Sequence, residues 1–342
     1  MRGSTTRLAG AFAAAGLILT ATPLGAAPTN VERARMAARY VVDHQEADGS
    51  VPTFSTIGST ADTVVSLVAA KRGPGAIDRA IGFLEDHEAD VDGVGEKAKV
   101  IMALVAAGRN PRNFAGRDLV SELQSVKEDD GRLGAGTAVF DQALGVLALA
   151  AAGEPRKRPA AWLAAAQCPD GGWQYDAPQQ PDEDKHCFSG DPMADWFRSE
   201  VDATALAVQA LETTFVREDL VRSPFRFFRA VRDEAKGGWG YSPDFPLTNA
   251  NSTSLVIQAY AARGRDLPDG VLRALRALQH RLCGPNAGAF AYSWNEESGS
   301  YDKQDPNLGA TVGAILGLLE RPLPLSPRDV TKAPPKAPAC PT

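Results

Sequence analysis

The sequence predicts an all-α protein in which six helix pairs close into an (α/α)6 toroid. A unit of helix, glycine turn and helix recurs six times, with a mean period of about 48 residues. The second helix of each unit is apolar on nearly all sides, whereas the first carries more charge. A helix that is apolar all round is buried on both sides, so the second helices predict an inner ring within an outer ring. An open solenoid of helix pairs is the alternative, and the uniform turns favour closure.

The chain begins with the pattern of a secretory signal peptide, residues 1–26. Two arginines precede an uncharged apolar stretch and a run of small residues with one proline. The apolar stretch is shorter than the ~20 residues that span a bilayer. We therefore expect an exported protein with no membrane span in the mature chain. The toroid is predicted over residues 30–320, followed by a proline-rich tail, residues 321–342.

Six glycine turns mark the units in order along the chain. Each is followed by an apolar helix, expected within residues 61–70, 99–107, 141–150, 202–211, 251–260 and 309–318. The turns are Asp48-Gly49, Asp92-Gly93, Asp130-Gly131, Asp170-Gly171-Gly172-Trp173, Gly237-Gly238-Trp239 and Gly288-Ala289-Phe290.

These turns carry a resemblance to known proteins. Residues 167–173, Gln-x-x-Asp-Gly-x-Trp, match the repeat of squalene cyclases, and residues 45–49 are a partial copy. Residues 237–239 with 251–253 resemble the repeat of protein prenyltransferase β subunits. The chain thus resembles the terpene cyclase and protein prenyltransferase toroid superfamily. In its export signal, cysteines and six helix pairs it is most similar to the helical barrel of secreted cobalamin carriers. The resemblance implies the toroid fold, which serves several unrelated activities.

Charge and cysteine content restrict the function. The net charge of −6 argues against a nucleic-acid binder, which needs a basic face. The four cysteines are expected to form disulfides, because thiols pair outside the cytoplasm. We predict Cys168–Cys187 and Cys283–Cys340, although four cysteines allow three connectivities. None lies on a second helix, so we predict neither a metal site nor a cofactor.

One segment resembles the acid motif of class II terpene cyclases, Asp-x-Asp-Asp. Here the residues are Glu200-Val201-Asp202-Ala203, with alanine in place of the last acid. The resemblance implies that Asp202 would protonate an alkene with Glu200 beside it. Ser199-x-x-Asp202 also reads as a helix capping box. A capping carboxylate turns back to its own helix start, whereas a catalytic one points into a closed cavity.

Two further sets of residues are candidates for ligand binding. Polar residues recur at the starts of the second helices, and glutamines 209 and 258 recur one level deeper. Aromatic residues gather at the last three turns, where we expect Trp173 and Trp239 to plug gaps between units and the others to face a ligand. Lys99 and Thr311 also stand at the starts of second helices, and with the polar residues among the candidates below they form what we call the polar ring. The candidates are Asp62, Asp141, Asp202, Asn251, Tyr175, Tyr241, Tyr292, Trp294 and, in a long insertion, Trp196.

Together these observations predict an exported, non-catalytic toroid. Its partner is expected to be a small molecule or a protein at the glycine-turn end, as in the soluble component of a corrinoid-like nutrient uptake system. A class II cyclase-like enzyme that uses Asp202, and a secreted protein-interaction scaffold, are the alternatives.

Overall fold

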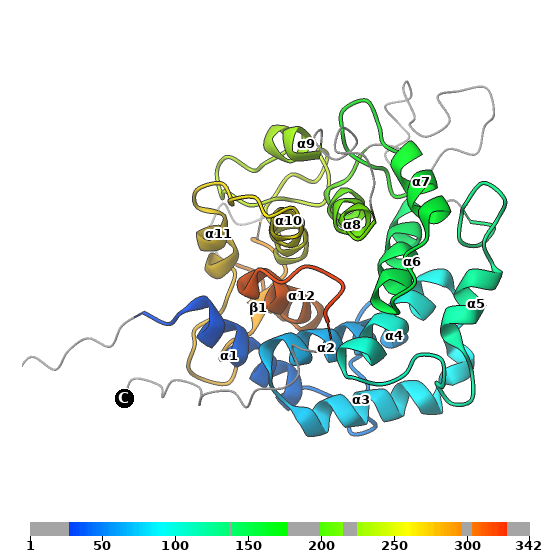
Figure 1. The fold of residues 1–342 in the computed structure, drawn as a ribbon. Helices are drawn as coiled ribbons and strands as arrows, with labels where there is room; N and C mark the ends of the chain where they lie inside the picture. Colours follow the sequence, from blue (N-terminus) through cyan, green and yellow to red (C-terminus); the bar gives the residue numbers. More distant parts are fainter. Residues whose placement is uncertain (1–26, 137, 177–198, 215–223, 296–302, 327–342) are drawn as a thin grey trace, which may run out of the picture.

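Six apolar helices form a closed inner ring around the axis of the molecule (Figure 1). The structure, a computed structural model, describes residues 27–136, 138–176, 199–214, 224–295 and 303–326. Each inner helix contacts the next one, and the last contacts the first, so the predicted closure is confirmed. The inner helices are α2 (Thr56–Ala70), α4 (Val94–Ala106), α6 (Val139–Ala151), α8 (Val201–Glu212), α10 (Ala250–Ala262) and α12 (Leu308–Leu319).

A second set of helices surrounds this ring (Figure 1). Each outer helix precedes an inner helix and packs against it or its neighbour, as the alternation of charged and apolar helices predicted. A short antiparallel pair, β1 (Phe290–Ala291) with β2 (Pro306–Asn307), lies before α12. The outer helices are α1 (Asn30–Asp43), α3 (Pro74–Asp86), α5 (Leu119–Ser125), α7 (Lys157–Ala165), α9 (Pro224–Ala230) and α11 (Val271–Ala277), and a 3-10 turn, η1 (Glu88–Asp90), follows α3.

The start of α8 differs from the predicted capping box. The N-cap is Glu200, whose carboxylate accepts a hydrogen bond from the Ala203 amide at 3.3 Å. Ser199 instead donates its hydroxyl proton to Asp170 of the preceding glycine turn, at 2.8 Å. The capping pair Ser199–Asp202 is therefore wrong, because Ser199 is used to fix the turn and Asp202 is left free of the helix end.

The two tryptophans that follow the turns are plugs, as predicted. Trp173 and Trp239 are both 0% exposed. Each indole N–H donates to a backbone carbonyl at the end of the preceding outer helix: Leu163 for Trp173 and Phe228 for Trp239, both at 2.7 Å. A buried indole needs such a partner. These residues stabilise the fold and offer no surface to a ligand.

Glutamine side chains fasten the first and the last glycine turns to the next unit. Gln45 donates to the carbonyl of its own turn glycine at 2.8 Å and to the start of α3 at 3.0 Å. Gln279 joins the last turn to the first helix in the same way, by donating to Gly288 and Arg33 at 3.1 Å each. A Cβ added to Gly288 would lie 2.4 Å from the backbone of Met36 in α1. The glutamine of the repeat therefore closes the ring.

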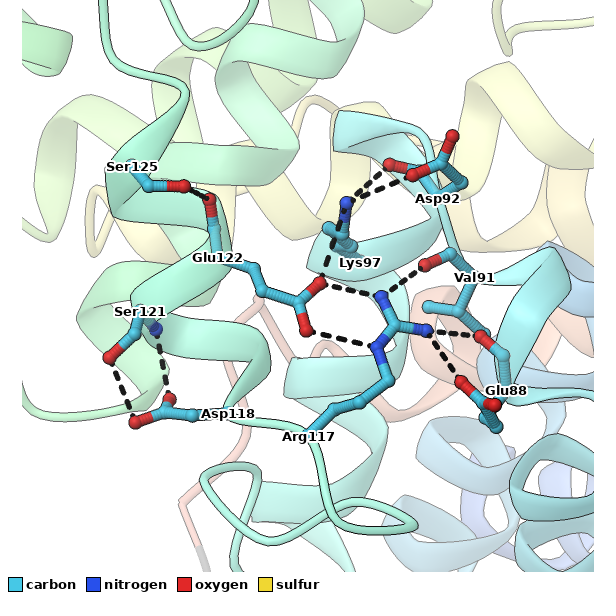
Figure 2. A network of polar contacts seen from close by, with 9 residues as sticks. All are labelled: Glu88, Val91, Asp92, Lys97, Arg117, Asp118, Ser121, Glu122 and Ser125. Atoms are coloured by element: carbon cyan, nitrogen blue, oxygen red, sulfur yellow. Dashed lines mark hydrogen bonds and ion pairs between the residues drawn. The ribbon is translucent and has the colours of Figure 1, made fainter.

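An arginine does the same work between the second and third units (Figure 2). Arg117 donates to the backbone carbonyls of Glu88 and Val91, the latter at 3.0 Å, and to the carboxylate of Glu122 at 2.9 Å. The ammonium group of Lys97 lies 3.6 Å from Glu122 and completes the network. These contacts join the turn before α4 to the outer helix α5, so the network is structural.

The residues after α12 pack beneath the ring instead of leaving it. The amide of Leu323 donates to Gln209 of α8 at 2.9 Å, and Leu325 is 5% exposed. Gln209, a deeper polar residue of the inner helices, is therefore occupied by the chain itself. The rest of the predicted tail, residues 327–342, lies outside the described residues.

Several predictions fall on residues that the structure does not describe. These are the signal peptide, residues 1–26, and Trp196, Cys187 and Cys340. Cys168 and Cys283 are both disulfide-bonded, and no described cysteine is free. The pairing of each stays a prediction. Among the helices that the structure describes, none is long and apolar enough to cross a bilayer.

Candidate functional site

A cavity of about 270 Å³, here called the axial cavity, lies inside the inner ring. All six inner helices contribute to its wall, so only closure of the ring creates it. Its lining includes Asp62 and Val65 of α2, Lys99 and Met102 of α4, Phe140 and Leu144 of α6, Asp202 and Leu206 of α8, Asn251, Ser254, Leu255 and Gln258 of α10, Gly309, Gly313 and Leu316 of α12, and Leu323.

Asp202 faces this cavity from the second position of α8. The side-chain atom Oδ1 is buried and has no hydrogen-bond partner among the described residues. Burial raises the pKa of Asp202 to about 6, although a hydrogen bond with Ser252 acts in the opposite direction. Of the two readings of Asp202 from the sequence, the structure excludes helix capping and places the carboxyl on the cavity wall.

Three more polar atoms of the cavity wall lie on one face of α10. Asn251 Oδ1, Ser254 Oγ and Gln258 Oε1 are buried without a partner among the described residues. Their spacing of three and four residues aligns them along the helix. Ser254 is 1% exposed and Gln258 is 2% exposed. Buried polar atoms are nearly always hydrogen-bonded in proteins, so this row of acceptors indicates a polar occupant.

An ion pair lies on another part of the wall. The ammonium of Lys99 in α4 is 2.7 Å from the carboxylate of Asp62 in α2. In the ring order, α2 is three places from α8, so the pair and Asp202 come from opposite sides. Asp62 thus reaches the cavity as predicted, but it has a cation as its partner.

Glu200 and Tyr241 form a buried pair beside Asp202. Glu200 is 3% exposed, and the Tyr241 hydroxyl donates a hydrogen bond to its carboxyl group. Burial, followed by the charge of Asp202, raises the pKa of Glu200 to about 8. Burial and Glu200 also raise the pKa of the Tyr241 hydroxyl. Both groups are therefore mainly uncharged at neutral pH.

The structure does not bring Asp141 to the cavity. Its carboxylate lies against the start of α4, because a Cβ on Gly95 would be 2.6 Å from Asp141 Oδ1. Burial and then the charge of Glu96 raise the pKa of Asp141. Tyr175 stacks on the ring of Phe140 with centroids 5.6 Å apart and is 40% exposed. Tyr175 therefore supports a wall residue and does not line the cavity.

The other predicted aromatic residues form a separate surface feature, here called the rim groove. It has a volume of about 960 Å³ and lies between the turns of the fifth and sixth units. Phe245 in it is 65% exposed, and Lys236 lies 4.2 Å from the Trp294 ring centroid. The rim groove is lined by Tyr241, Asp244, Phe245, Pro246, Leu247, Asn249, Tyr292, Ser293, Trp294, Asn295 and Gln304.

The predicted polar ring mixes two structural roles. Thr311 accepts a hydrogen bond from the Phe290 amide at 2.9 Å, and Thr253 accepts one from the Trp239 amide at 3.0 Å. These threonines fix the turns, so Thr311 is not a ligand-binding residue. Asn251 stands two residues before Thr253 and faces the axis. The sequence pattern also missed Ser254, although polar residues at 251, 254 and 258 in an otherwise apolar helix were a usable signal.

Comparison with known proteins gives the fold. No family model matches the chain, and no curated protein matches it. A protein from Actinoplanes is similar in structure at 16% identity, with a TM-score of 0.55 over 89% of this chain and 100% of that one. The type II terpene cyclase MstE from Scytonema is similar at 13% identity and a TM-score of 0.57, over 85% and 97% of the two chains.

The α-1,6-mannanase GH76A from Salegentibacter is similar at 11% identity, with a TM-score of 0.57 over 85% of this chain and 98% of that one. The protein has the α/α toroid fold. At these identities the likeness shows the fold alone, because the same toroid carries unrelated chemistries. Among the described residues, no group of three or more His, Cys, Asp or Glu side chains is arranged to hold a metal ion.

Proposed function

We propose that this protein binds a small molecule in the axial cavity and does not chemically change it. The observation that carries the proposal is a set of buried acceptor atoms on the cavity wall that have no partner among the described residues: Asp202 Oδ1, Asn251 Oδ1 and Gln258 Oε1. Leaving a buried polar atom unpaired costs about 1–3 kcal/mol. A ligand that donates hydrogen bonds to these atoms offsets that cost, and nothing else in the described wall does.

The cavity volume limits the size of the ligand. About 270 Å³ lies just below the ~300–1,000 Å³ of pockets for drug-sized molecules. A corrinoid, suggested by the resemblance to cobalamin carriers, is larger than such a molecule. We therefore propose a smaller nutrient. Its capture outside the cytoplasm is supported by the signal-peptide pattern of residues 1–26 and by the disulfide bonds of Cys168 and Cys283.

Native mass spectrometry of the protein purified from its own culture medium tests this function. We expect a mass increment from one bound small molecule that disappears on denaturation. The control is Leu255→Trp, because Leu255 lines the cavity and a larger side chain there fills it. An empty protein, or the same increment in Leu255→Trp, would overturn the proposal.

A class II cyclase-like activity is the second candidate, because Asp202 lines a cavity and has a pKa of about 6. Protonation of an alkene creates a carbocation. The carboxylate of Asp62 lines the same cavity and would take a proton from this carbocation. We therefore place binding first. Incubation with geraniol, a ten-carbon isoprenoid small enough for the cavity, and gas chromatography of the products tests the alternative: a cyclised product that Asp202→Asn abolishes supports it, and no product removes it.

A further inference from the structure

We infer that the ligand of the axial cavity is a small organic cation: an amine whose ammonium group binds at the level of Asp202 and Asn251 and whose carbon chain extends toward Gln258. This inference rests on the proposed function and names the chemical class of the ligand. It is carried by three features of the cavity wall: the kind of polar atoms without partners, the balance of charge, and the position of the apolar residues.

The polar atoms without partners are mainly acceptors. Asp202 Oδ1, Asn251 Oδ1 and Gln258 Oε1 accept hydrogen bonds and do not donate them, and Ser254 Oγ does both. A primary ammonium carries three N–H donors and no acceptor. It therefore complements this wall, whereas a carboxylate or phosphate would meet acceptors and leave them unpaired.

The charges of the wall also favour a cation. Lys99 and Asp62 neutralise each other at 2.7 Å. Asp202 has no such counter-ion among the described residues, so the cavity carries one net negative charge when this carboxyl is ionised. A buried carboxylate without a counter-ion is strongly disfavoured, and an ammonium bound next to it removes that penalty.

The position of the groups on α10 sets the shape of the ligand. Asn251 and Gln258 are seven residues apart, which corresponds to about 10 Å along the helix axis. Between these levels the wall includes the apolar side chains of Leu206 and Leu255. A ligand that matches this order has a cationic head, an apolar chain and a second donor group at its far end.

Calorimetric titration with probes that share one carbon chain tests the inference. The probes are hexylamine, hexan-1-ol and hexanoate at about pH 7, where Asp202 is mainly ionised and Glu200 is not. We expect hexylamine to bind about tenfold more tightly than hexan-1-ol, because a charge-assisted hydrogen bond is roughly twice as strong as a neutral one. Hexanoate should bind most weakly. 6-Aminohexan-1-ol, which adds a donor at the far end, should bind at least as tightly as hexylamine.

A pair of variants locates the effect. Asp202→Asn should reduce the advantage of hexylamine over hexan-1-ol to less than about threefold. Its circular dichroism spectrum should match that of the wild type and so report that it is folded. Asp141→Asn is the matched control, because Asp141 is also a half-buried carboxyl near an inner-helix start but does not line the cavity. It should retain the full preference for the amine.

The pH dependence gives an independent readout. Glu200 and Tyr241 beside Asp202 are mainly uncharged near neutral pH. Tyr292, which follows the turn of the sixth unit, also lies close enough to feel the charge of Asp202. The Asp62–Lys99 pair lies across the cavity. Ionisation of Asp202, whose pKa is about 6, therefore governs binding. Hexylamine should bind about tenfold more weakly at pH 5 than at pH 7, where Glu200 is still mainly uncharged, whereas hexan-1-ol should change little.

The outcomes separate this inference from the proposed function. Equal binding of the three probes, abolished by Leu255→Trp, would overturn the cation and leave the binding function in place. An amine preference that survives in Asp202→Asn would also overturn it. If no probe binds, the inference fails, and the native mass spectrum decides the binding function separately.

Discussion

Replacing Asp202 by asparagine should make the protein more stable at alkaline pH. The folded structure raises the pKa of Asp202 from 3.8 to about 6, so the native state holds its proton more tightly than the unfolded chain. Stability is therefore lost as pH rises from about 4 to about 6, and the loss is complete above about pH 7. The difference between the two pKa values corresponds to a free energy of about 3 kcal/mol. Because Asp202 is partly exposed, we expect Asp202→Asn to raise the free energy of unfolding by about 1–3 kcal/mol at pH 8.

Urea unfolding followed by circular dichroism, with the disulfides intact, measures this gain. At about pH 4 the variant and the wild type should differ little, because the native Asp202 is already protonated there. Asp62→Asn is the comparison variant, since it removes the partner of Lys99 at 2.7 Å and should not stabilise the protein. An equal gain for Asp202→Asn at both pH values, or no gain at pH 8, would refute the reasoning.

Two further predictions concern the ring itself. Gly288→Ala should destabilise the protein by about 2–5 kcal/mol, because its φ is 89° and the new Cβ would lie 2.4 Å from the backbone of Met36. Gly284→Ala is the control, since Gly284 has a similar φ of 99° but no neighbour within 4 Å. It should destabilise the protein by only about 1–2 kcal/mol. Equal unfolding midpoints for these two variants would show that the last turn does not close the ring. Trp239→Phe should lower the free energy of unfolding by about 1–3 kcal/mol in the same assay, because it leaves the carbonyl of Phe228 without its donor and opens a cavity. An unchanged unfolding midpoint would show that Trp239 does not stabilise the contact between units.

The repeat was readable from the sequence because helix pairs impose a period on the chain. Six glycine turns and six apolar helices were enough to predict twelve helices in two rings, and contacts between α12 and α2 confirm closure. Gln279 explains why the turn signal is strong: its side chain bonds both its own turn and α1, so the repeat residues are those that join successive units.

The role of the polar residues at the starts of the inner helices was harder to predict, because one polar side chain can fit a capping pattern or bind a neighbouring turn. Ser199 looked like a cap for α8, but it binds Asp170 while Glu200 takes the capping position. A shift of one residue at a helix start changes which side chain faces the axis. For that reason the polar ring read from the sequence included Thr311, which fixes a turn, together with Asp202, which faces the cavity.

The sequence by itself determined the fold, the repeat and the plugging role of Trp173 and Trp239, because all three depend on local spacing. Only the tertiary structure decided which polar residues share a cavity. Asp202 and Asp141 both lie in the first turn of an inner helix, yet only Asp202 lines the cavity, because it is the second residue of α8 whereas Asp141 is the third residue of α6 and so points to a different side. A binding site made by six helices exists only when the ring has closed.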